Sequence, residues 1–485
     1  MNTTVSTRGT ASVSHRSAAT APLVLADFGS TYTKVTVVDT CDGRLVATAR
    51  HPTTLESDVL DGLDRSLAAL EPSVPGIAEA SVWACSSAGG GLRVAVIGLE
   101  RDLTAEAARL AALSAGARVD TVLAGRVPAL DELIAEPPDI VLLTGGTDGG
   151  DARGILAAAE ALAGSVLDVP IVVAGNAESQ ADAEATLRAA GKRVTRAPNV
   201  MPEIGVTACD GARDIIRQQF LRHVIGGKHL SEGSRFIDML RMATPDAVLS
   251  GVELLARGRA GHAGLGPVVV LDVGGATTDV HSVTAHDPGG DGMERPLLPQ
   301  PDVMRTVEGD LGLRWNAPGI VAAARTANLL SVHEADELAE PVALRAADPS
   351  FTPDSKTERR IDVRLAGLAA RLALLRHAGR ISITLSTAGA SVRRQGRDLR
   401  AIPRVVGTGG VFEHGDREQL ADTVALACGP ADGRLLPRPR EVLADRCYLL
   451  AAAGLLAGDH PELAVRLLDD HLMPLWPSGE DRAHD

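Results

Sequence analysis

The sequence predicts an α/β protein with two similar halves, because two short segments far apart in the chain share one pattern. The first, from Leu23, reads LVLADFGSTYTKVTVVD, and the second, from Val268, reads VVVLDVGGATTDVHSV. Each consists of an apolar run, an aspartate, a turn of small and hydroxyl residues, and a second run typical of a β-strand. Between the two segments, short apolar runs alternate with amphipathic stretches, which indicates strands alternating with helices.

Each of these predicted hairpins has the residues of half a phosphate site. Asp27 and Asp272 end the two apolar runs. The tight turn after Asp27 would let the backbone N–H groups of Gly29, Ser30 and Thr31 face a phosphate, and the aspartate can hold Mg²⁺ or its waters. One Asp-x-Gly turn is ordinary hairpin chemistry. Two such turns facing each other would form a nucleotide clamp.

A third glycine-rich turn follows another apolar run, in the segment VVGTGGVF at 405–412. A turn without side chains lets the backbone approach an adenine or a ribose closely. Such a turn alone is more often a loop than a ligand site, but here it follows two phosphate-type hairpins. We therefore expect it to line an adenosine.

Composition excludes several classes of function. A chain of 485 residues is too long for one hydrophobic core, so two or more domains are expected. The content of 45% hydrophobic but only 2% aromatic residues predicts a globular protein with an aliphatic core. With 48 basic against 62 acidic residues the net charge is −14, and no stripe of Lys and Arg with interleaved aromatics is present, which argues against nucleic-acid binding.

Cysteine usage and hydropathy predict a cytoplasmic protein. The five cysteines are scattered, odd in number and never in C-x-x-C spacing, which indicates reduced thiols rather than disulfides or a zinc site. No apolar stretch approaches ~20 residues, so no membrane-spanning helix is expected. Residues 1–22 are rich in Ser, Thr and Ala without an apolar core, which favours a disordered tail over a transit peptide.

After the tail, the chain is expected to form a first domain at 23–265 and a second at 266–485. The first would contain an α/β insertion at Ser81–Arg196, whose alternation predicts a mostly parallel sheet covered on both faces. Helices are expected at Asp151–Ala163 and Ala177–Ala190, and the segment 212–260 is expected to be mainly helical. The expected strands of the first half are Arg44–Arg50, Val82–Ser86, Arg93–Gly98, Val119–Leu123, Ile140–Thr144, Ile171–Ala174 and Arg193–Thr195.

The second half is expected to contain a helical insertion. Residues 317–380 are rich in Ala, Leu and Arg with helical periodicity, and an exposed loop is expected at His286–Pro301. Strand-like segments follow at 381–386 and 401–412. The stretch from Arg440 to Pro474 is expected to be helical.

The order of two Asp-x-Gly hairpins and a Gly-Gly loop resembles the actin, Hsp70 and sugar-kinase superfamily, in which two similar domains close on ATP–Mg²⁺. Further motifs resemble the glutamate mutase L family, also called MutL, over about Leu23–Leu468. These motifs are LTGGTDGGD (143–151), AGN (174–176), NVMPEIG (199–205), TVEGDLGLRWNA (306–317), GTGGVF (407–412) and DRCYLLAAAGLLA (445–457). The resemblance implies two actin-like (ribonuclease H-like) domains with an ATP cleft between them, plus α/β and helical insertions.

The family resemblance also implies a function and a partner. The chain would be an ATPase that serves as an accessory, reactivating chaperone for an adenosylcobalamin-dependent mutase, freeing that enzyme of damaged cobalamin. The D-x-H-x-x-G motif that presents a histidine to cobalt is not found, so the chain would act on a cobalamin enzyme rather than be one. The block Ser81–Arg196, with its turn Thr144–Gly150, lies outside the phosphate motifs and is expected to face the mutase.

Residue roles follow from position in the family motifs. Asp27 and Asp272 would hold Mg²⁺ through water, and Glu203 would activate the attacking water, with Gln180 and Asp279 as competitors. The residues expected to bind nucleotide are Gly29, Ser30, Thr31 and Lys34 from one side, Gly274, Gly275, Thr277 and Thr278 from the other, and Gly407, Thr408, Gly409 and Gly410 around the adenosine.

Other interpretations of these residues remain open. Thr277 and Thr278 fit β-branched strand positions equally, Lys34 fits a solvated strand lysine, and the turn Thr144–Gly150 fits either a plain strand-to-helix turn or an anion site. The same fold also serves small-molecule kinases, although no sugar-kinase signature surrounds an aspartate of the first half. A third alternative is a binding or structural protein that hydrolyses ATP slowly.

Overall fold

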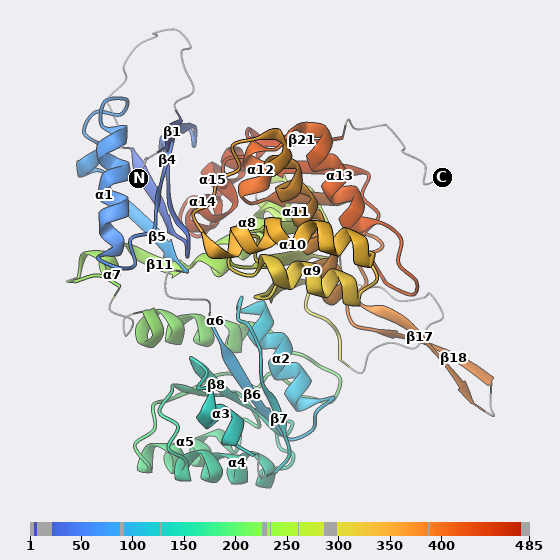
Figure 1. Cartoon of the computed structure of the whole chain (residues 1–485). Helices are drawn as coiled ribbons and strands as arrows, with labels where there is room; N and C mark the ends of the chain where they lie inside the picture. The colour runs from blue at the N-terminus through green and yellow to red at the C-terminus, as the bar shows by residue number, and fades with distance from the viewer. Residues whose placement is uncertain are drawn as a thin grey trace.

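Two six-stranded sheets form the frame of the protein (Figure 1). In the chain order of the first sheet, β1 is Thr4–Ser6, β2 Leu23–Phe28, β3 Tyr32–Val38, β4 Leu45–Pro52, β5 Val82–Ser86 and β11 Leu240–Ala243. In the second, β14 is Val268–Val273, β15 Thr278–Val283, β16 Val303–Glu308, β19 Arg404–Thr408, β20 Glu441–Asp445 and β21 Leu472–Pro474. This computed structural model describes residues 4–6, 22–87, 92–126, 129–225, 230–232, 234–259, 261–285, 298–386 and 389–476.

Five strands of each sheet have the same topology, and the sixth, β1 or β21, is added at opposite edges. In the first, β2 pairs antiparallel with β3 and β3 with β4, while β2, β5 and β11 run parallel. In the second, β14, β15 and β16 repeat the antiparallel meander, while β14, β19 and β20 run parallel. This is the ribonuclease H-like strand order, present twice. The predicted fold class, with two such actin-like units, is confirmed.

The central strands are apolar on both faces because both faces are covered. Val24 and Ala26 of β2 lie in the core of the first half, whereas Leu23 and Leu25 lie in a core shared by the two halves. In β14, residues 269, 271 and 273 lie in the core of the second half, and 268 and 270 in the shared core. By strand alternation, Asp27 and Asp272 are on the faces directed toward the shared core. The hairpin pattern therefore places both aspartates between the halves.

Two helices join the halves through this shared core. α8, Thr244–Arg257, follows β11, and α14, Leu449–Leu456, follows β20 at the equivalent place in the second half. A Cβ on Gly251 would overlap the carbonyl oxygen of Leu450, and one on Gly454 would overlap that of Ala247. The helix backbones are thus in direct contact. α15, Pro461–Asp469, packs beside them.

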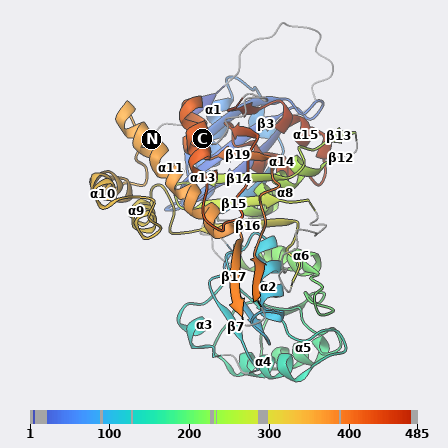
Figure 2. The same ribbon diagram turned by 90° about the vertical axis from the view of Figure 1, so that its right-hand side faces the viewer.

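A separate five-stranded parallel sheet is inserted between β5 and β11, in the order β10-β9-β8-β6-β7. It lies at one end of the molecule in both views (Figure 1, Figure 2). The predicted parallel sheet is therefore confirmed, except that β5 belongs to the first main sheet because it pairs with β2. The elements of the inserted unit are β6 Val94–Gly98, α2 Thr104–Ser114, β7 Val122–Ala124, α3 Asp131–Ala135, β8 Ile140–Leu143, α4 Arg153–Gly164, β9 Ile171–Val173, α5 Gln180–Ala189 and β10 Val194–Arg196.

The remaining elements largely agree with the helices expected from sequence. The predicted helical stretch from Arg440 instead begins with β20 and ends with β21, because a five-residue apolar run has no periodicity that separates strand from helix. β17 and β18 form a hairpin that projects from the second half (Figure 1). These elements are α1 Val59–Leu70, the 3₁₀ turn Ile77–Glu79, α6 Cys209–Gln219, the π-helix Phe220–Ile225, α7 Arg235–Met239, β12 Gly258–Arg259, β13 His262–Ala263, α9 Ala317–Thr326, α10 Val332–Ala347, α11 Lys356–His377, β17 Arg380–Ser386, β18 Gly389–Gln395, α12 Gly410–His414 and α13 Arg417–Cys428.

Two expectations concern segments that the structure describes only in part. Within the predicted tail 1–22, β1 pairs antiparallel with β4, and the other residues up to 21 lie outside the described part. Most of the predicted loop His286–Pro301 is likewise outside the described residues. No helix in the described part of the chain is long and apolar enough to span a membrane.

The contact between α8 and α14 generates a stability prediction. Gly454→Ala should lower the free energy of unfolding by about 2–3 kcal/mol, because its methyl group would overlap the Ala247 carbonyl and push the two helices apart. Chemical denaturation measures this change. Gly458→Ala is the matched control, since a Cβ there meets no atom within 4 Å. Equal stabilities of the two variants would contradict the close helix contact.

Candidate functional site

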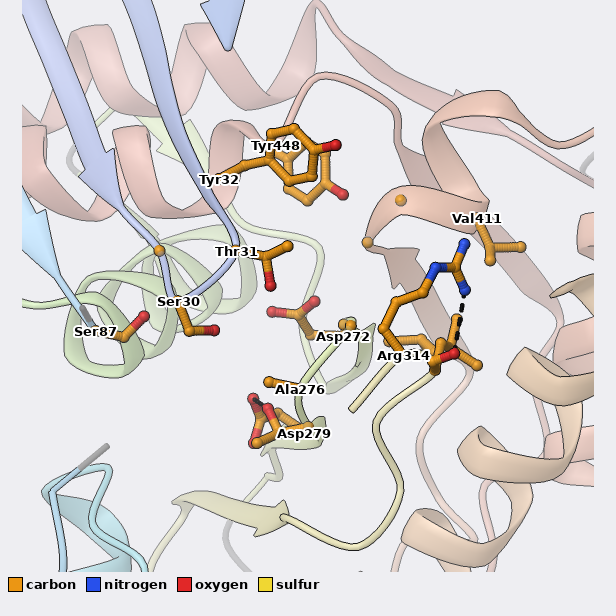
Figure 3. Close-up of a pocket in the computed structure, with 18 of the residues that line it drawn as sticks. Ser30, Thr31, Tyr32, Ser87, Asp272, Ala276, Asp279, Arg314, Val411 and Tyr448 are labelled. Atoms are coloured by element: carbon orange, nitrogen blue, oxygen red, sulfur yellow. Dashed lines mark hydrogen bonds between the residues drawn. The ribbon is translucent and has the colours of Figure 1, made fainter. Parts of the chain in front are cut away.

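A pocket of about 1350 Å³ lies between the two halves. Both predicted hairpin turns and the turn at Gly409–Gly410 line it, together with the start of α8, the Arg314 loop and the first turns of α11. Figure 3 shows Ser30 and Thr31 of the first turn opposite Asp272 and Ala276 of the second. The three motifs that the sequence singled out therefore converge on one cavity.

The two hairpin turns are closed by the same hydrogen bond. The Gly29 N–H donates to the Tyr32 carbonyl at 3.1 Å, and the Gly274 N–H donates to the Thr277 carbonyl at 2.9 Å. These two amides are consequently not free for a phosphate, which corrects the prediction for Gly29. Among the described residues of the two turns, no hydrogen bond to a backbone carbonyl is formed by the amides of Ser30, Thr31, Gly275, Ala276 and Thr277.

The turns also lie against each other. A Cβ built on Gly275 would be 3.5 Å from the Thr31 hydroxyl oxygen, across the boundary between the halves. Free amides from two adjacent turns form a concave donor surface, and such a surface suits an oxyanion. The facing arrangement expected from the paired motifs is therefore present in the geometry.

Asp27 is held by three neighbours. It is 8% exposed, and its Oδ1 accepts hydrogen bonds from the Thr244 hydroxyl at 2.6 Å and from the Cys85 thiol at 3.6 Å. Lys34 Nζ lies 3.6 Å from its Oδ2 and 3.7 Å from the centre of the Tyr448 ring. Lys34 is thus a pocket residue paired with Asp27, and it does not extend freely into solvent.

Asp272 lies opposite Asp279 in the antiparallel ladder of the second half. Burial, followed by the neighbouring Asp279, raises the pKa of Asp272 to about 7, although Lys34 and Arg305 oppose the rise. Burial also raises the pKa of Asp279, although the Arg305 guanidinium, which donates to Asp279 Oδ1 at 3.0 Å, opposes this. Two carboxylates short of compensating positive charge suit a divalent cation.

The residues therefore fit an ATP–Mg²⁺ group on chemical grounds. Asp27 and Asp272 supply carboxylate oxygens on the facing walls, the preferred ligands of Mg²⁺. The unpartnered turn amides would donate hydrogen bonds to phosphate oxygens. No cluster of three or more potential metal ligands occurs in the described part of the chain, so water and phosphate oxygens would complete the shell.

The glycine-rich turn after β19 divides into structural and pocket-lining positions. Gly407 does not line the pocket, because a Cβ there would collide with the Phe412 ring, which fills the core beneath it. Thr408 is also buried outside the pocket. Gly409 and Gly410 do line it, and Gly409 has a φ of 110° with its Cα against the Val273 carbonyl. The close backbone approach expected here is confined to these last two glycines.

Several other predicted residues lie away from the pocket. Glu203 is exposed in the loop after β10 and does not line it. The Gln180 side-chain amide donates to the carbonyls of Gly175 and Ala197 and is thereby committed to the inserted sheet. Thr278 is buried and donates to the Leu311 carbonyl. Of the three candidates for water activation, Asp279 is the one that lines the pocket.

Two further predictions have different outcomes. Thr277 lines the pocket, and its hydroxyl donates to Asp279 Oδ2 at 3.2 Å. The turn Thr144–Gly150 is outside the pocket, at the carboxyl edge of the inserted sheet, where Asn176 and Asn199 hydrogen-bond it. These local hydrogen bonds fit a plain strand-to-helix turn. Such a turn explains the glycines of this segment without an anion site.

Sequence reasoning left the role of Arg314 open and did not predict the rest of the basic side of the pocket. Arg314 donates to Asp362 at 2.6 Å and to the Phe351 carbonyl at 3.0 Å, which fixes it over the cavity. The start of α11 contributes Lys356 and Arg359. Arg314 is part of the motif TVEGDLGLRWNA, which could have indicated it, whereas nothing in the sequence indicated which face of α11 lines a cavity.

An ion pair links the halves at the pocket. Arg50 of β4 donates to Glu413 of α12 at 2.6 Å and lies 2.9 Å from His414 Nε2. Burial lowers the pKa of His414, and Arg50 lowers it further, so this histidine is held neutral beside the guanidinium. Because Arg50 and His414 both line the pocket, this pair joins the two walls at one side of the cavity.

The repeated sheet and the pocket between its copies define the class: a two-domain α/β protein of the actin-like type. The family follows from comparison. The model of the MutL protein family matches residues 23–472. Protein MutL of Clostridium tetanomorphum is 37% identical over 458 residues, which cover 93% of this chain and 99% of the relative. The chain belongs to the MutL family, as its motifs predicted.

Similar solved structures share little sequence. The ethanolamine utilization protein EutJ from Carboxydothermus hydrogenoformans is 11% identical with a TM-score of 0.27, covering 92% of this chain and 88% of its own. A glycerol dehydratase reactivase is 12% identical with a TM-score of 0.31, covering 90% of this chain and 99% of its own. At these scores the assignment of the fold rests on the strand order of the two sheets.

The charge of Asp272 generates a prediction about stability. Its folded-state pKa of about 7 lies above the value of about 3.9 for an unfolded aspartate. The folded protein therefore binds this proton more tightly, and stability is lost as the pH rises from about 4 to 7. Asp272→Asn should raise the free energy of unfolding at pH 8 by roughly 2 kcal/mol, after allowance for solvent in the pocket. At pH 4 we expect no gain.

Asp279→Asn is the matched control, because Asp279 is paired with Arg305. Its replacement leaves a buried guanidinium without its carboxylate and should destabilise the protein at pH 8. Urea unfolding at both pH values measures the two changes. A loss of stability in Asp272→Asn would show that the ionised carboxylate is well solvated or compensated.

Proposed function

We propose that this chain is an ATPase of the actin-like type that serves as an accessory protein for an adenosylcobalamin-dependent mutase. The observation that carries the ATPase assignment is the pair of Asp-bearing hairpin turns on facing walls of one pocket. Membership of the MutL family carries the assignment of the partner.

The residues would divide the chemistry between the halves. The free amides of Ser30 and Thr31 hold phosphate oxygens from one wall, and those of Gly275 and Ala276 hold them from the other. Asp27 and Asp272 hold Mg²⁺ through water, and this ion, when bound, neutralises charge that develops on the phosphoryl oxygens. Asp279, beside Asp272, is positioned to accept a proton from the attacking water, and Thr277 orients its carboxylate.

The adenosine would occupy the side of the pocket lined by the second half. Gly409 and Gly410 present backbone without side chains there, and the start of α11 presents Lys356 and Arg359. A nucleotide so placed touches both halves, since its phosphates reach the first turn. The halves would close on ATP and open on ADP, as hinged clamps do.

The inserted domain would provide the surface for the mutase. Its amino edge faces the pocket, because Arg93, Arg118 and Asp139 line the cavity, so its carboxyl edge is directed away from the pocket. The loop 199–205 is at that carboxyl edge, and Ile204 in it is 77% exposed. This edge is held in place by the hydrogen bonds of Asn176 and Asn199 to the turn Thr144–Gly150. An exposed apolar side chain on such a fixed surface suits a contact with another protein.

A small-molecule kinase is the second candidate, and the size of the pocket favours it. A volume of about 1350 Å³ exceeds the ~300–1,000 Å³ of ordinary ligand pockets. The part near Leu92 and Arg93 would then hold an acceptor substrate. Phosphate release in the presence of the mutase, without a phosphorylated small molecule, supports the accessory ATPase over the kinase.

The aspartates provide a first test of the ATPase. Asp27→Ala and Asp272→Ala should each lower ATP turnover by about 10²-fold or more, because the cation that supports transition-state charge is lost. Circular dichroism should show an intact fold. Asp182→Ala, at an exposed position on α5, is the control and should turn over ATP at the wild-type rate. Wild-type turnover in both pocket variants would disprove the roles of these aspartates.

The partner is tested with a mutase inactivated by damage to its cobalamin. Binding should depend on nucleotide, and activity should return when ATP and fresh adenosylcobalamin are supplied. Ile204→Asp should abolish this recovery while leaving basal ATP turnover unchanged. Val166→Asp is the control, because Val166 is 79% exposed but precedes β9 at the opposite edge. Recovery without ATP would exclude the reactivating role.

A further inference from the structure

Gly116 of the inserted domain lies next to residues that hold two carboxylates of the site. Arg305 pairs with Asp279, and Pro245 follows Thr244, which hydrogen-bonds Asp27. Gly116 lies two residues after the last residue of α2 and has a φ of 77°, and its N–H donates to the Leu113 carbonyl at 3.1 Å. The left-handed turn directs the Gly116 carbonyl out of the helix toward the second half. There it accepts a hydrogen bond from Arg305 Nη1.

Arg305 connects this carbonyl to the pocket. The side chain is 5% exposed, and its second terminal nitrogen donates to Asp279 Oδ1 at 3.0 Å. In the ladder Arg305 lies opposite His281, two positions from the row that contains Asp272 and Asp279. One planar guanidinium therefore spans from the site carboxylate to the end of α2, and a change in either end must move the other.

Gly116 has a second contact, with the first half. A Cβ on Gly116 would lie 3.4 Å from Pro245 Cβ, in the first turn of α8. The preceding residue, Thr244, donates its hydroxyl to Asp27 Oδ1 at 2.6 Å. The turn after α2 therefore lies beside Pro245, the residue that follows Thr244, on one side and accepts from Arg305, the partner of Asp279, on the other.

We infer that Gly116 is the junction that couples the position of the inserted domain to the nucleotide site, with Arg305 as the positioning residue for Asp279. The inference rests on the proposed function and adds the route by which a partner bound to the inserted domain is felt at the nucleotide. Thr244 and Pro245 belong to the first half and Arg305 to the second. When the halves move relative to each other, the contacts of Pro245 and Arg305 with Gly116 therefore change together. By linkage, a partner bound to the inserted domain changes the affinity for nucleotide by the same factor as the nucleotide changes the affinity for that partner.

The test measures amide hydrogen exchange in the full chain, with and without Mg²⁺ and a non-hydrolysable ATP analogue. In the wild type, the analogue should slow exchange in the two hairpin turns and change exchange at the end of α2, over 111–118. In Arg305→Gln the turns should still be protected, whereas the response at 111–118 should be lost. The ATP turnover number should fall by about 10-fold while KM for ATP stays within about 2-fold, since Asp279 acts on the water and not on nucleotide binding.

Conservative and matched variants separate positioning from mere structural support. Arg305→Lys should recover part of the turnover, because an ammonium can still pair with Asp279, but not the response at 111–118, because it cannot span to Gly116 as well. Arg397→Gln removes a guanidinium buried to a similar degree that donates to the carbonyls of Pro301, Asp302 and Ser282, outside the site. It should lower stability without changing the response.

The glycine is tested in the same way. Gly116→Ala and Gly191→Ala impose the same left-handed strain, at φ values of 77° and 80°, but a methyl group at 191 meets no atom within 4 Å. The response at 111–118 should be weakened in the first variant and intact in the second. An unchanged response in Arg305→Gln, or a wild type in which only the turns respond, would overturn the coupling while leaving the proposed function standing. A wild type whose turns are not protected by the analogue would overturn both.

Discussion

The direct backbone contact between α8 and α14 is the constraint on which the rest of the structure depends. Because Gly251 and Gly454 have no side chains, the two helices approach until carbonyl oxygens fill the space of the missing Cβ atoms. Each helix follows the last parallel strand of its own sheet, so this single contact sets the distance between the sheets. The facing hairpin turns, the separation of Asp27 from Asp272 and the volume of the pocket all follow from that distance.

The pocket retains carboxylates at a cost in stability. Asp272 and Asp279 lie side by side in a ladder, and burial together with like charge raises the pKa of Asp272 to about 7. One lysine and one arginine offset this charge only in part. A site with more negative than positive charge favours binding of a cation. Without a cation, the same imbalance makes the protein less stable at neutral pH than a variant with asparagine in place of Asp272.

The inserted domain contacts the rest of the molecule through an apolar cluster and through residues that line the pocket. One face of its sheet has a core of its own, whereas the other face and α2 belong to the core of the first half. Its amino edge lines the cavity. Under the proposed function, a partner on the carboxyl edge would act on the site through this shared core and through the buried guanidinium of Arg305. This arrangement explains why motif residues such as those of Thr144–Gly150 lie far from the pocket, yet belong to the same family pattern.

The sequence by itself determined the two hairpins, their aspartates, the parallel insertion and the family, because each of these depends on local periodicity and turn chemistry. It did not determine that Gly407 serves Phe412 packing, that the Gly29 amide closes its own turn, or that Glu203 lies outside the pocket, since such outcomes depend on which surfaces meet. Only the tertiary structure brought together Arg314, Lys356 and the two turns, and only it joined Gly116 to Arg305. Arg314 and Lys356 lie 42 residues apart along the chain, and Gly116 and Arg305 lie 189 apart. No periodicity of a single chain encodes a contact over such separations.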